Sequence, residues 1–384
     1  MSRFEINGTR NIDFTLYKSD IRELKSRWKK FIQTIPPCPT HFEGRGIVIC
    51  AGGLRYFTCA WINIMSLRRL GCTLPIELWY VGNELSDEIK KEIEQFNVVC
   101  RNFLDHNDNY YQGYILKPLS IIYSSFKEIL FLDADNVCVK DPEELFGLEE
   151  YVQNGAVFWP DYWQTSSLNP IWPITGCTYT DSKEQESGQI LLNKEKCWKA
   201  LNLCLHFNSH SNVYYKLLLG DKDTFRFAWL ALKTPYFMIK TEPATCGYRN
   251  NGKFLGTTMI QYNTRSEFYF LHRNLLKWDV TQPGEKIWLN IKRFYPDAQE
   301  KQYFIHYSDN GHYYMDLQGD VEELNFTDLF GNYEEVCIEF LDKLRSSAIY
   351  KSFVTYSHFA TYRFPKYTSF TLNAYAAPAA GIKV

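Results

Sequence analysis

Two carboxylates separated by one residue follow an apolar run in KEILFLDADNVCVKDP, residues 127 to 142. Asp133 and Asp135 flank Ala134. Because residues i and i+2 of an extended chain point to the same side, both carboxylates can face one site while Ala134 faces packed neighbours. Mg²⁺ and Mn²⁺ take oxygen ligands and share their remaining positions with substrate phosphates. The segment predicts a Mn²⁺ or Mg²⁺ site, with an aspartyl-phosphate nucleophile and a polar turn at a strand end as alternatives.

A histidine and a lysine that could join this site occur in FLHRNLLKW, residues 270 to 278. His272 stands at the end of an expected strand, and Lys277 follows five residues later. An imidazole can complete the coordination of a cation, and an ammonium can neutralise a diphosphate leaving group. A lone histidine is more often structural, so this hypothesis requires His272 to reach the sheet edge that carries the two aspartates.

The segment ESGQILLNK, residues 186 to 194, combines small and polar residues at an expected strand start. Ser187 and Gly188 leave room for the close approach of a ligand. Gln189 can form hydrogen bonds with sugar hydroxyls. A plain β-turn explains this segment equally well.

The segment GDKDTF, residues 220 to 225, offers Asp221 and Asp223 at an expected helix N-terminus. Helix capping accounts for one of these acids. Phosphatases with an aspartyl-phosphate nucleophile carry a similar later segment, which keeps that alternative open. Their nucleophile strand normally opens the fold, whereas three expected strand–helix units precede Asp133.

Predicted strands and helices alternate along the first part of the chain, and they must position these residues. Apolar runs predict strands within residues 46–53, 74–82, 98–103 and 128–133, and helical periodicity predicts helices at 55–70, 86–96 and 115–126. This alternation favours a parallel α/β sheet covered by helices on both faces. Ligands bind at the carboxyl ends of the strands in such sheets, which is where Gly52, Gly53 and the two aspartates fall.

The composition excludes some partners. The formal net charge is −2, from 42 basic and 44 acidic residues that are intermixed, so nothing predicts binding to nucleic acid. No apolar run is long enough to span a membrane. The 11 cysteines are odd in number and lack the spacing of a zinc site or disulfide framework. We therefore expect a soluble, cytoplasmic protein, with the Golgi lumen as an option only for a piece of a longer chain.

Together these motifs resemble those of GT-A glycosyltransferases, distantly the glycogenin-like retaining enzymes. The segments FLDADN, ESGQIL, GDKDTF and HRNLLKW occur in the order typical of that group. The sequence is more similar to the fungal α-mannosyltransferases that extend mannan side chains, glycosyltransferase family 71. That similarity covers about residues 45 to 278 and is carried by LPIELWY, KPLSIIYSSFKEILFLDADN, WPDYW and ESGQ.

The resemblance implies a role for each matching residue. It implies that the metal is held by Asp133, Asp135 and His272. It implies that the donor is bound by Gly52, Gly53, Arg55, Tyr56, Lys117, Asp133 and Lys277. It implies that the sugar and acceptor are contacted by Trp159, Asp161, Trp163, Glu186, Ser187 and Gly188, although core packing competes as the explanation for the tryptophans. It implies catalytic roles for Gln189, Asp221 and Asp223.

The resemblance also implies the activity and architecture. We expect a GT-A fold with a mixed, mostly parallel sheet, divided into an N-terminal helical segment (1–44), a catalytic domain (45–280) and a C-terminal α/β extension (281–384). The expected reaction is a metal-dependent, retaining transfer of mannose from GDP-mannose to a glycan or glycoprotein acceptor. A UDP-sugar donor, the phosphatase, and an inactive glycan-binding protein are the alternatives. The sequence leaves the oligomeric state open.

Overall fold

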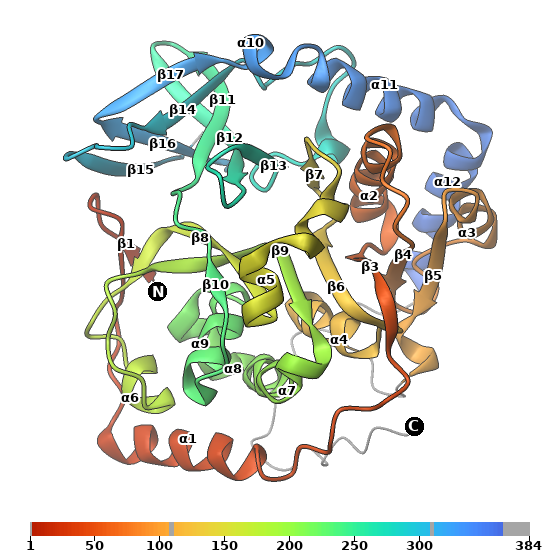
Figure 1. Cartoon of the computed structure of the whole chain (residues 1–384). Helices are drawn as coiled ribbons and strands as arrows, with labels where there is room; N and C mark the ends of the chain where they lie inside the picture. Colours follow the sequence, from red (N-terminus) through yellow and green to blue (C-terminus); the bar gives the residue numbers. More distant parts are fainter. Residues whose placement is uncertain (1, 107–110, 308–310, 364–384) are drawn as a thin grey trace.

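A computed structural model describes residues 2–106, 111–307 and 311–363. The chain forms two β-sheets that meet near the centre of the molecule, with helices packed around the larger one (Figure 1). Residues 364–384 of the predicted C-terminal extension lie outside the described residues.

The larger sheet is mixed and mainly parallel, as the sequence predicts. Strands β3, β4, β5 and β6 run parallel to one another, and β9 runs antiparallel between β6 and β8. This arrangement confirms the predicted α/β fold class. In sheet order the strands are β1 (Ser2–Phe4), β2 (Thr9–Ile12), β8 (Ala156–Thr165), β9 (Lys183–Asn193), β6 (Phe126–Asp133), β3 (Glu43–Cys50), β4 (Ile76–Tyr80) and β5 (Val98–Asn102), with β10 (Phe237–Met238) paired to β8.

The central strands of this sheet are apolar because both of their faces are buried. In β6, Leu130 and Leu132 face one apolar core, whereas Ile129 and Phe131 face the other. Successive side chains of a strand point to opposite faces, so a strand covered on both sides needs a continuous apolar run. That run ends at Asp133, where β6 leaves the covered part of the sheet.

Helices cover the two faces in separate groups (Figure 1). One core is closed by α1 (Lys18–Phe31), α4 (Leu116–Tyr123), α6 (Ile171–Thr175), α7 (Lys194–Ser209), α8 (Ser211–Leu218) and α9 (Lys222–Leu232). The other is closed by α2 (Gly53–Arg69), α3 (Asp87–Glu94), α5 (Glu149–Asn154), α10 (Phe326–Phe330), α11 (Tyr333–Ser346) and α12 (Ala348–Arg363). Within the described residues, every helix is too short or too polar to cross a membrane.

The second sheet is antiparallel and takes strands from both sides of residue 280. Its strands, in order, are β15 (Lys301–Tyr307), β16 (Tyr313–Gly319), β12 (Lys253–Tyr262), β11 (Ala244–Asn250), β14 (Asn290–Phe294) and β17 (Val321–Asn325), and β13 (Phe268–His272) joins β12 to β7 (Asn136–Cys138). The domain division at residues 44 and 280 stays a prediction.

The two sheets meet at the aspartate pair. The chain passes from β6 through Asp133 and Asp135 directly into β7, which pairs with β13 of the second sheet. In that pairing Asn136 lies opposite His272. We expected His272 at the edge of the sheet that carries the aspartates; it comes instead from the second sheet, and β7 brings it to them. The expected strand start at Glu186 is also different, because Glu186 lies inside β9.

Candidate active site

The turn after β6 holds the two aspartates in the orientation that the sequence predicts. Asp133 ends β6, and Ala134 is buried and packs in the apolar core beneath the turn. The Asn63 amide of α2 donates a hydrogen bond to the Asp133 carbonyl at 3.2 Å. A helix side chain and a small buried spacer therefore fix the backbone from which both carboxylates project.

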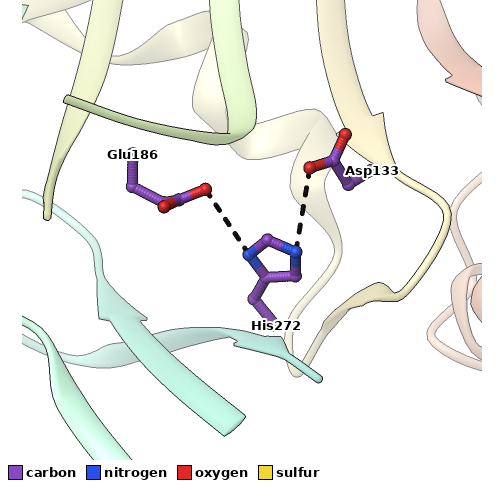
Figure 2. A group of neighbouring side chains, drawn as sticks. All are labelled: Asp133, Glu186 and His272. Atoms are coloured by element: carbon purple, nitrogen blue, oxygen red, sulfur yellow. Dashed lines mark ion pairs between the residues drawn. The ribbon is translucent and has the colours of Figure 1, made fainter. Parts of the chain in front are cut away.

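His272 lies between the carboxylates of Asp133 and Glu186 (Figure 2). Its Nε2 is 3.7 Å from an Asp133 oxygen and 3.3 Å from an Asp135 oxygen, and its Nδ1 is 3.7 Å from a Glu186 oxygen. One ligand atom from each of Asp133, Glu186 and His272 lies within 4.8 Å of the others. Two carboxylates and an imidazole facing one point are a donor set that Mn²⁺ can accept.

The backbone of β9 presents Glu186 to this histidine. The amides of Ser187 and Gly188 donate to the Glu186 carboxylate at 3.0 and 2.9 Å. A Cβ at Gly188 would lie only 2.4 Å from His272 Nδ1. The sequence suggested that Gly188 leaves room for a ligand. In the structure, the missing side chain at Gly188 leaves room for the His272 ring.

Lys117 joins three parts of the site. Its ammonium lies 3.1 Å from Asp133 and 3.3 Å from Asp221, and it donates to the Ser187 hydroxyl at 2.8 Å. Burial alone would lower the pKa of Lys117, but the carboxylates of Asp133, Asp221 and Glu186 outweigh burial and raise this pKa. Lys117 is therefore held as a cation beside the end of β6.

Lys277 forms a salt bridge with Asp135. The loop that carries Lys277 is anchored by Arg273, whose guanidinium donates to the Leu276 carbonyl at 2.7 Å and stacks 4.0 Å from the Trp278 ring. Arg273 also lies 3.5 Å from Glu334 of α11. The predicted pairing of a histidine with a lysine five residues later therefore holds in space, because both contact Asp135.

This site gathers more carboxylates than lysines. We call these residues the acidic cluster: Asp133, Asp135, Glu186 and Asp221, with Lys117, Lys277 and His272. Its four carboxylates face two lysines. Burial alone would lower the pKa of His272, but Asp135, Glu186 and Asp133 outweigh it and raise the pKa. Carboxylates gathered in a partly buried site are costly unless cations compensate them.

Gln189 is fully buried one residue beyond this cluster. Its carbonyl oxygen accepts a hydrogen bond from the Asn136 amide at 2.6 Å, and Asn136 also donates to the Gly188 carbonyl at 2.8 Å. Among the described residues, no partner for Gln189 Nε2 is found. The predicted catalytic role of Gln189 stays a prediction, and the structure gives it a contact with the turn after Asp135.

Asp221 and Asp223 occupy different environments, although the sequence suggested catalytic roles for both. Asp221 contacts Lys117 and accepts from the Ser187 hydroxyl at 3.3 Å, which places it in the acidic cluster. Asp223 is fully buried and binds Arg226 through two hydrogen bonds of 2.7 and 2.9 Å. The contacts of Asp223 are those of a structural ion pair.

The aromatic residues expected near the sugar lie mainly in packed regions. Trp159 pairs with Glu186 across the β8–β9 ladder, but its ring is fully buried and its indole donates to the Tyr262 carbonyl at 2.8 Å. Trp163 packs against Phe4, with ring centroids 4.4 Å apart. Asp161 pairs with Lys222. The structure does not bring the two tryptophan rings to the acidic cluster.

Gly52, Gly53 and Arg55, which were expected at the nucleoside, follow β3. This strand pairs with β6 on the side opposite β9. A Cβ at Gly52 would meet the Glu84 carboxylate at 1.8 Å, so Gly52 is needed for a close approach of Glu84. Arg55 lies 3.5 Å from Asp279, two residues beyond Lys277. Tyr56 is 46% exposed and Gly53 begins α2 with φ +67. These donor-binding assignments stay predictions.

Sequence reasoning did not predict the contact between Glu186 and His272 in the acidic cluster. Glu186 was expected at the acceptor, yet it contacts the imidazole of His272. The available signal was Gly188 two residues later, which marks a close approach. Sequence alone could not say that the approaching group was a ring 84 positions further along the chain.

A mixed α/β sheet with an acid-rich, buried site at the end of a central strand is the arrangement expected of the glycosyltransferase class. A family model described as "Mannosyltransferase putative" matches residues 44–185 and 177–263, together more than half of the chain. The chain belongs to this mannosyltransferase family. The resemblance to fungal mannosyltransferases is thereby confirmed, and it favours glycosyl transfer over the phosphatase alternative.

Individual relatives agree with the family. The chain is 27% identical to alpha-1,2-mannosyltransferase MNN22 of Candida albicans, covering 67% of the chain and 52% of that protein. It is 28% identical to alpha-1,2-mannosyltransferase MNN2 of Saccharomyces cerevisiae, covering 58% and 46%. The chain spans about half the length of the curated relatives it matches.

Solved structures with similarity to this chain include two transferases. The glycosyltransferase GlyE of Streptococcus pneumoniae gives a TM-score of 0.37 at 15% identity, covering 52% of this chain and 46% of that one. Mouse xyloside xylosyltransferase 1 gives a TM-score of 0.34 at 17% identity, covering 51% and 85%.

Proposed function

We propose that this protein is a divalent-cation-dependent mannosyltransferase that transfers mannose from GDP-mannose to a hydroxyl of a glycan acceptor. The observation that carries the proposal is the donor set of Asp133, Glu186 and His272, whose ligand atoms lie within 4.8 Å of one another in a cluster that has more carboxylates than lysines. Mannose as the transferred sugar is supported by the family and by the names of the relatives, which are alpha-1,2-mannosyltransferases.

The residues present fit a divalent cation. Asp133, Glu186 and His272 would hold Mn²⁺ or Mg²⁺, because their ligand atoms already lie within 4.8 Å of one another. When bound, the ion would neutralise charge on the diphosphate of the donor. Asp135, which the sequence also predicts as a ligand, orients His272 through the 3.3 Å contact and holds Lys277. Its direct coordination stays a prediction.

The two lysines are positioned to bind an anionic donor. Lys117 and Lys277 both contact the turn between β6 and β7, one through Asp133 and the other through Asp135. Both remain protonated in the cluster, because nearby carboxylates raise the pKa of each lysine despite burial. A diphosphate that approaches this turn would replace carboxylates as their partner, and the developing charge of the leaving group would be stabilised electrostatically.

Retention of configuration follows from the proposed donor and product. The mannosyl group of GDP-mannose is α-linked, and the relatives are named for α linkages. An α product formed from an α donor is a net retention. In a front-face reaction the acceptor oxygen bonds to the anomeric carbon as the bond to the diphosphate breaks, and the acceptor proton passes to a diphosphate oxygen. The role left to the protein is orientation and charge stabilisation, for which Gln189 and Asp221 are the candidates.

A thermal-denaturation panel tests this function. GDP, GDP-mannose, UDP and a UDP-hexose would each be added with Mn²⁺ or with EDTA. A ligand at a hundredfold excess over its dissociation constant stabilises the folded state by about 2.7 kcal/mol. We expect the largest rise in Tm with GDP-mannose and Mn²⁺. Stabilisation that is equal in EDTA would overturn the role of the cation, and stabilisation by UDP ligands alone would overturn the donor.

A further inference from the structure

Helix α11 contacts the loop that carries Lys277, although neither belongs to the region matched by the family model. That region ends at residue 263, and both the loop and α11 follow it. We call residues 273–289, which join β13 to β14, the Lys277 loop. The loop starts beside the aspartate pair, because the Arg273 amide donates to the Asp135 carbonyl at 3.0 Å. The contacts of α11 with this loop therefore bear on the acidic cluster.

Glu334 of α11 joins the two ends of the Lys277 loop. Its carboxylate accepts hydrogen bonds from the amides of Ile287 and Trp288, at 2.9 and 3.0 Å, near the end of the loop. The same carboxylate lies 3.5 Å from the guanidinium of Arg273 at the start of the loop. The side chains of Arg273 and Glu334 are almost fully buried, so these contacts are made where water does not weaken them. A single side chain of α11 thus closes the loop.

Arg345, about three turns further along α11 than Glu334, holds the middle of the loop. Its guanidinium donates to the Thr281 carbonyl at 2.7 Å and to the Asp279 carbonyl at 2.8 Å. A planar guanidinium can bind both carbonyls in one orientation. The backbone that follows Lys277 is therefore fixed by two hydrogen bonds from the helix.

Arg273 fills the centre of the Lys277 loop. Its guanidinium donates to the Thr281 hydroxyl at 2.8 Å and lies 4.0 Å from the Trp278 ring. The Trp278 ring in turn meets the Trp288 ring edge to face, with centroids 5.2 Å apart. These packed residues lie on both sides of Lys277 in the sequence, so the backbone has little freedom at the point where Lys277 projects.

Lys277 depends on its backbone for a fixed position. Its ammonium forms a salt bridge with Asp135, and the side chain is 17% exposed. A lysine side chain is flexible and loses conformational entropy when it is held in one place. A loop that is fixed from behind by α11 restricts the positions that the ammonium can occupy and keeps it beside Asp135.

We propose that Glu334 and Arg345 are positioning residues, through which α11 holds the ammonium of Lys277 at the acidic cluster. The inference rests on the proposed function, in which Lys277 binds the diphosphate of the donor. Neither residue of α11 would touch the donor or the cation. Release of the loop would weaken nucleotide binding through Lys277 and leave other buried lysines of the protein in place. A helix of the predicted C-terminal extension thereby gains a role in the reaction.

Lysine labelling tests the position of Lys277 without any ligand. Acetic anhydride reacts with a neutral amine, so a lysine that is buried and paired with a carboxylate is labelled slowly. Mass spectrometry of the full chain would give the rate at each lysine. The internal reference is Lys222, which is 13% exposed and paired with Asp161 and Glu184.

Arg345→Met is the main variant, because Arg345 is half-buried and its loss leaves no charged group without its partner. Lys343→Met, an exposed residue of the same helix, is the matched control. We expect Arg345→Met to raise the labelling rate of Lys277 about tenfold, because the loss of two hydrogen bonds favours local opening. Lys222 should be labelled as in the wild type. Glu334→Gln, the second variant, should release Lys277 at least as far.

Calorimetric titration with GDP and Mn²⁺ tests the consequence for the donor. We expect Arg345→Met to weaken GDP binding about tenfold, a loss of about 1.4 kcal/mol. In a Lys277→Ala background, Arg345→Met should cause no further loss, because both changes then act through one ammonium. A purely structural effect of Arg345 would lower the affinity equally in both backgrounds and would overturn the positioning role.

The labelling results separate this inference from the proposed function. An unchanged rate at Lys277 in Arg345→Met would overturn the inference, and so would an equal rise at Lys222, which would indicate general destabilisation. If Lys277 alone is released but the wild type binds no nucleotide with Mn²⁺, the proposed function fails while the positioning by α11 stands. If the wild type binds GDP with Mn²⁺ and Arg345→Met changes neither labelling nor affinity, only the positioning fails.

Discussion

Two buried groups of charged side chains lie beside β9 and differ in their charge balance. The acidic cluster has four carboxylates and two lysines around His272. The second group, which we call the balanced cluster, pairs three carboxylates with three cations, and its members are Asp161, Glu184 and Asp223 with Arg10, Lys222 and Arg226. Glu184 of one cluster and Glu186 of the other are two residues apart on the same strand.

The two clusters differ in how far their carboxylates are paired within the protein. In the balanced cluster, Glu184 lies 2.7 Å from Arg10 and 2.6 Å from Lys222, so its charge is compensated within the protein. In the acidic cluster, the ion pair found for Glu186 among the described residues is with His272, and no lysine or arginine lies within ion-pair distance of it. Buried charges persist when they are paired. The cluster with fewer lysines and arginines than carboxylates is the one in which we propose a cation site.

Neutralising Asp133 should have the largest effect on function. Asp133→Asn removes a charged ligand and should lower mannosyl transfer by at least about a thousandfold, since a metal stabilises transition-state charge by several kcal/mol. Stability in EDTA should change by about 1 kcal/mol or less, because the carboxylate is partly exposed and Lys117 keeps Asp221 as a partner. Initial rates and urea denaturation measure the two quantities. A variant that keeps Mn²⁺-dependent transfer would remove Asp133 from the metal site.

The same substitution in the balanced cluster should act on folding. Asp223→Asn leaves the Arg226 guanidinium buried without its bidentate partner. Breaking a buried ion pair from one side costs about 3 to 5 kcal/mol of unfolding free energy. Urea denaturation measures this loss. If Asp223→Asn instead retained full stability and lost transfer, Asp223 would be the catalytic residue that the sequence suggested, and the distinction between the clusters would fail.

Sequence patterns predicted the features of the two clusters that depend on local chemistry, namely the strands, the helix and the turn that carry the residues. The strands ending at Cys50 and Asp133, the helix after Gly52 and the buried spacer Ala134 all follow from apolar periodicity and turn chemistry. The aspartate pair, His272 and Lys277 were selected by residue type and order, and the structure places them in contact.

Sequence patterns could not predict which charges compensate one another. GDKDTF contains two similar aspartates, and only their tertiary partners distinguish them: Lys117 for Asp221 and Arg226 for Asp223. The second sheet could not be predicted from local patterns either, because β7 pairs with β13 across more than 130 positions of sequence. The tryptophans around residue 160 have the composition of a sugar site, but β8 buries the Trp159 ring in the core.

Gly188 should prove essential to the acidic cluster although it has no side chain. Gly188→Ala would put a Cβ 2.4 Å from His272 Nδ1 and push the ring away from Asp133 and Glu186. Displacing a ligand through its supporting structure typically lowers metal affinity about 10- to 100-fold. Titration with Mn²⁺ measures the affinity, and Gly147→Ala, where no atom lies within 4 Å of the new Cβ, is the matched control. Unchanged Mn²⁺ affinity in Gly188→Ala would mean that His272 is not a ligand.

Lys194 provides the smallest and most specific test of how charge pairing governs these interiors. Lys117 and Lys222 form ion pairs with carboxylates, whereas no ion pair of Lys194 is found among the described residues. Lys194 donates to the carbonyls of Ile122 at 3.2 Å and Ser124 at 2.5 Å. Burial lowers the pKa of Lys194 to about 6. Since the unfolded chain has the ordinary, higher lysine pKa, it binds more protons than the folded chain between these two values. The free energy of unfolding should therefore rise with pH above about 6.

Lys194→Met removes this titration and isolates its contribution. We expect Lys194→Met to be more stable than the wild type at neutral pH, and the difference to shrink by on the order of 1 kcal/mol per pH unit as the pH rises from 7 to 9. Urea denaturation of both proteins at each pH measures the difference. Curves that stay parallel would show that two carbonyl acceptors and the Phe42 ring, 3.1 Å from the ammonium, keep Lys194 charged. A buried lysine could then stay charged without a carboxylate partner. In that case, counting carboxylates and cations alone would not describe the electrostatics of the two clusters, and carbonyl dipoles would have to be included.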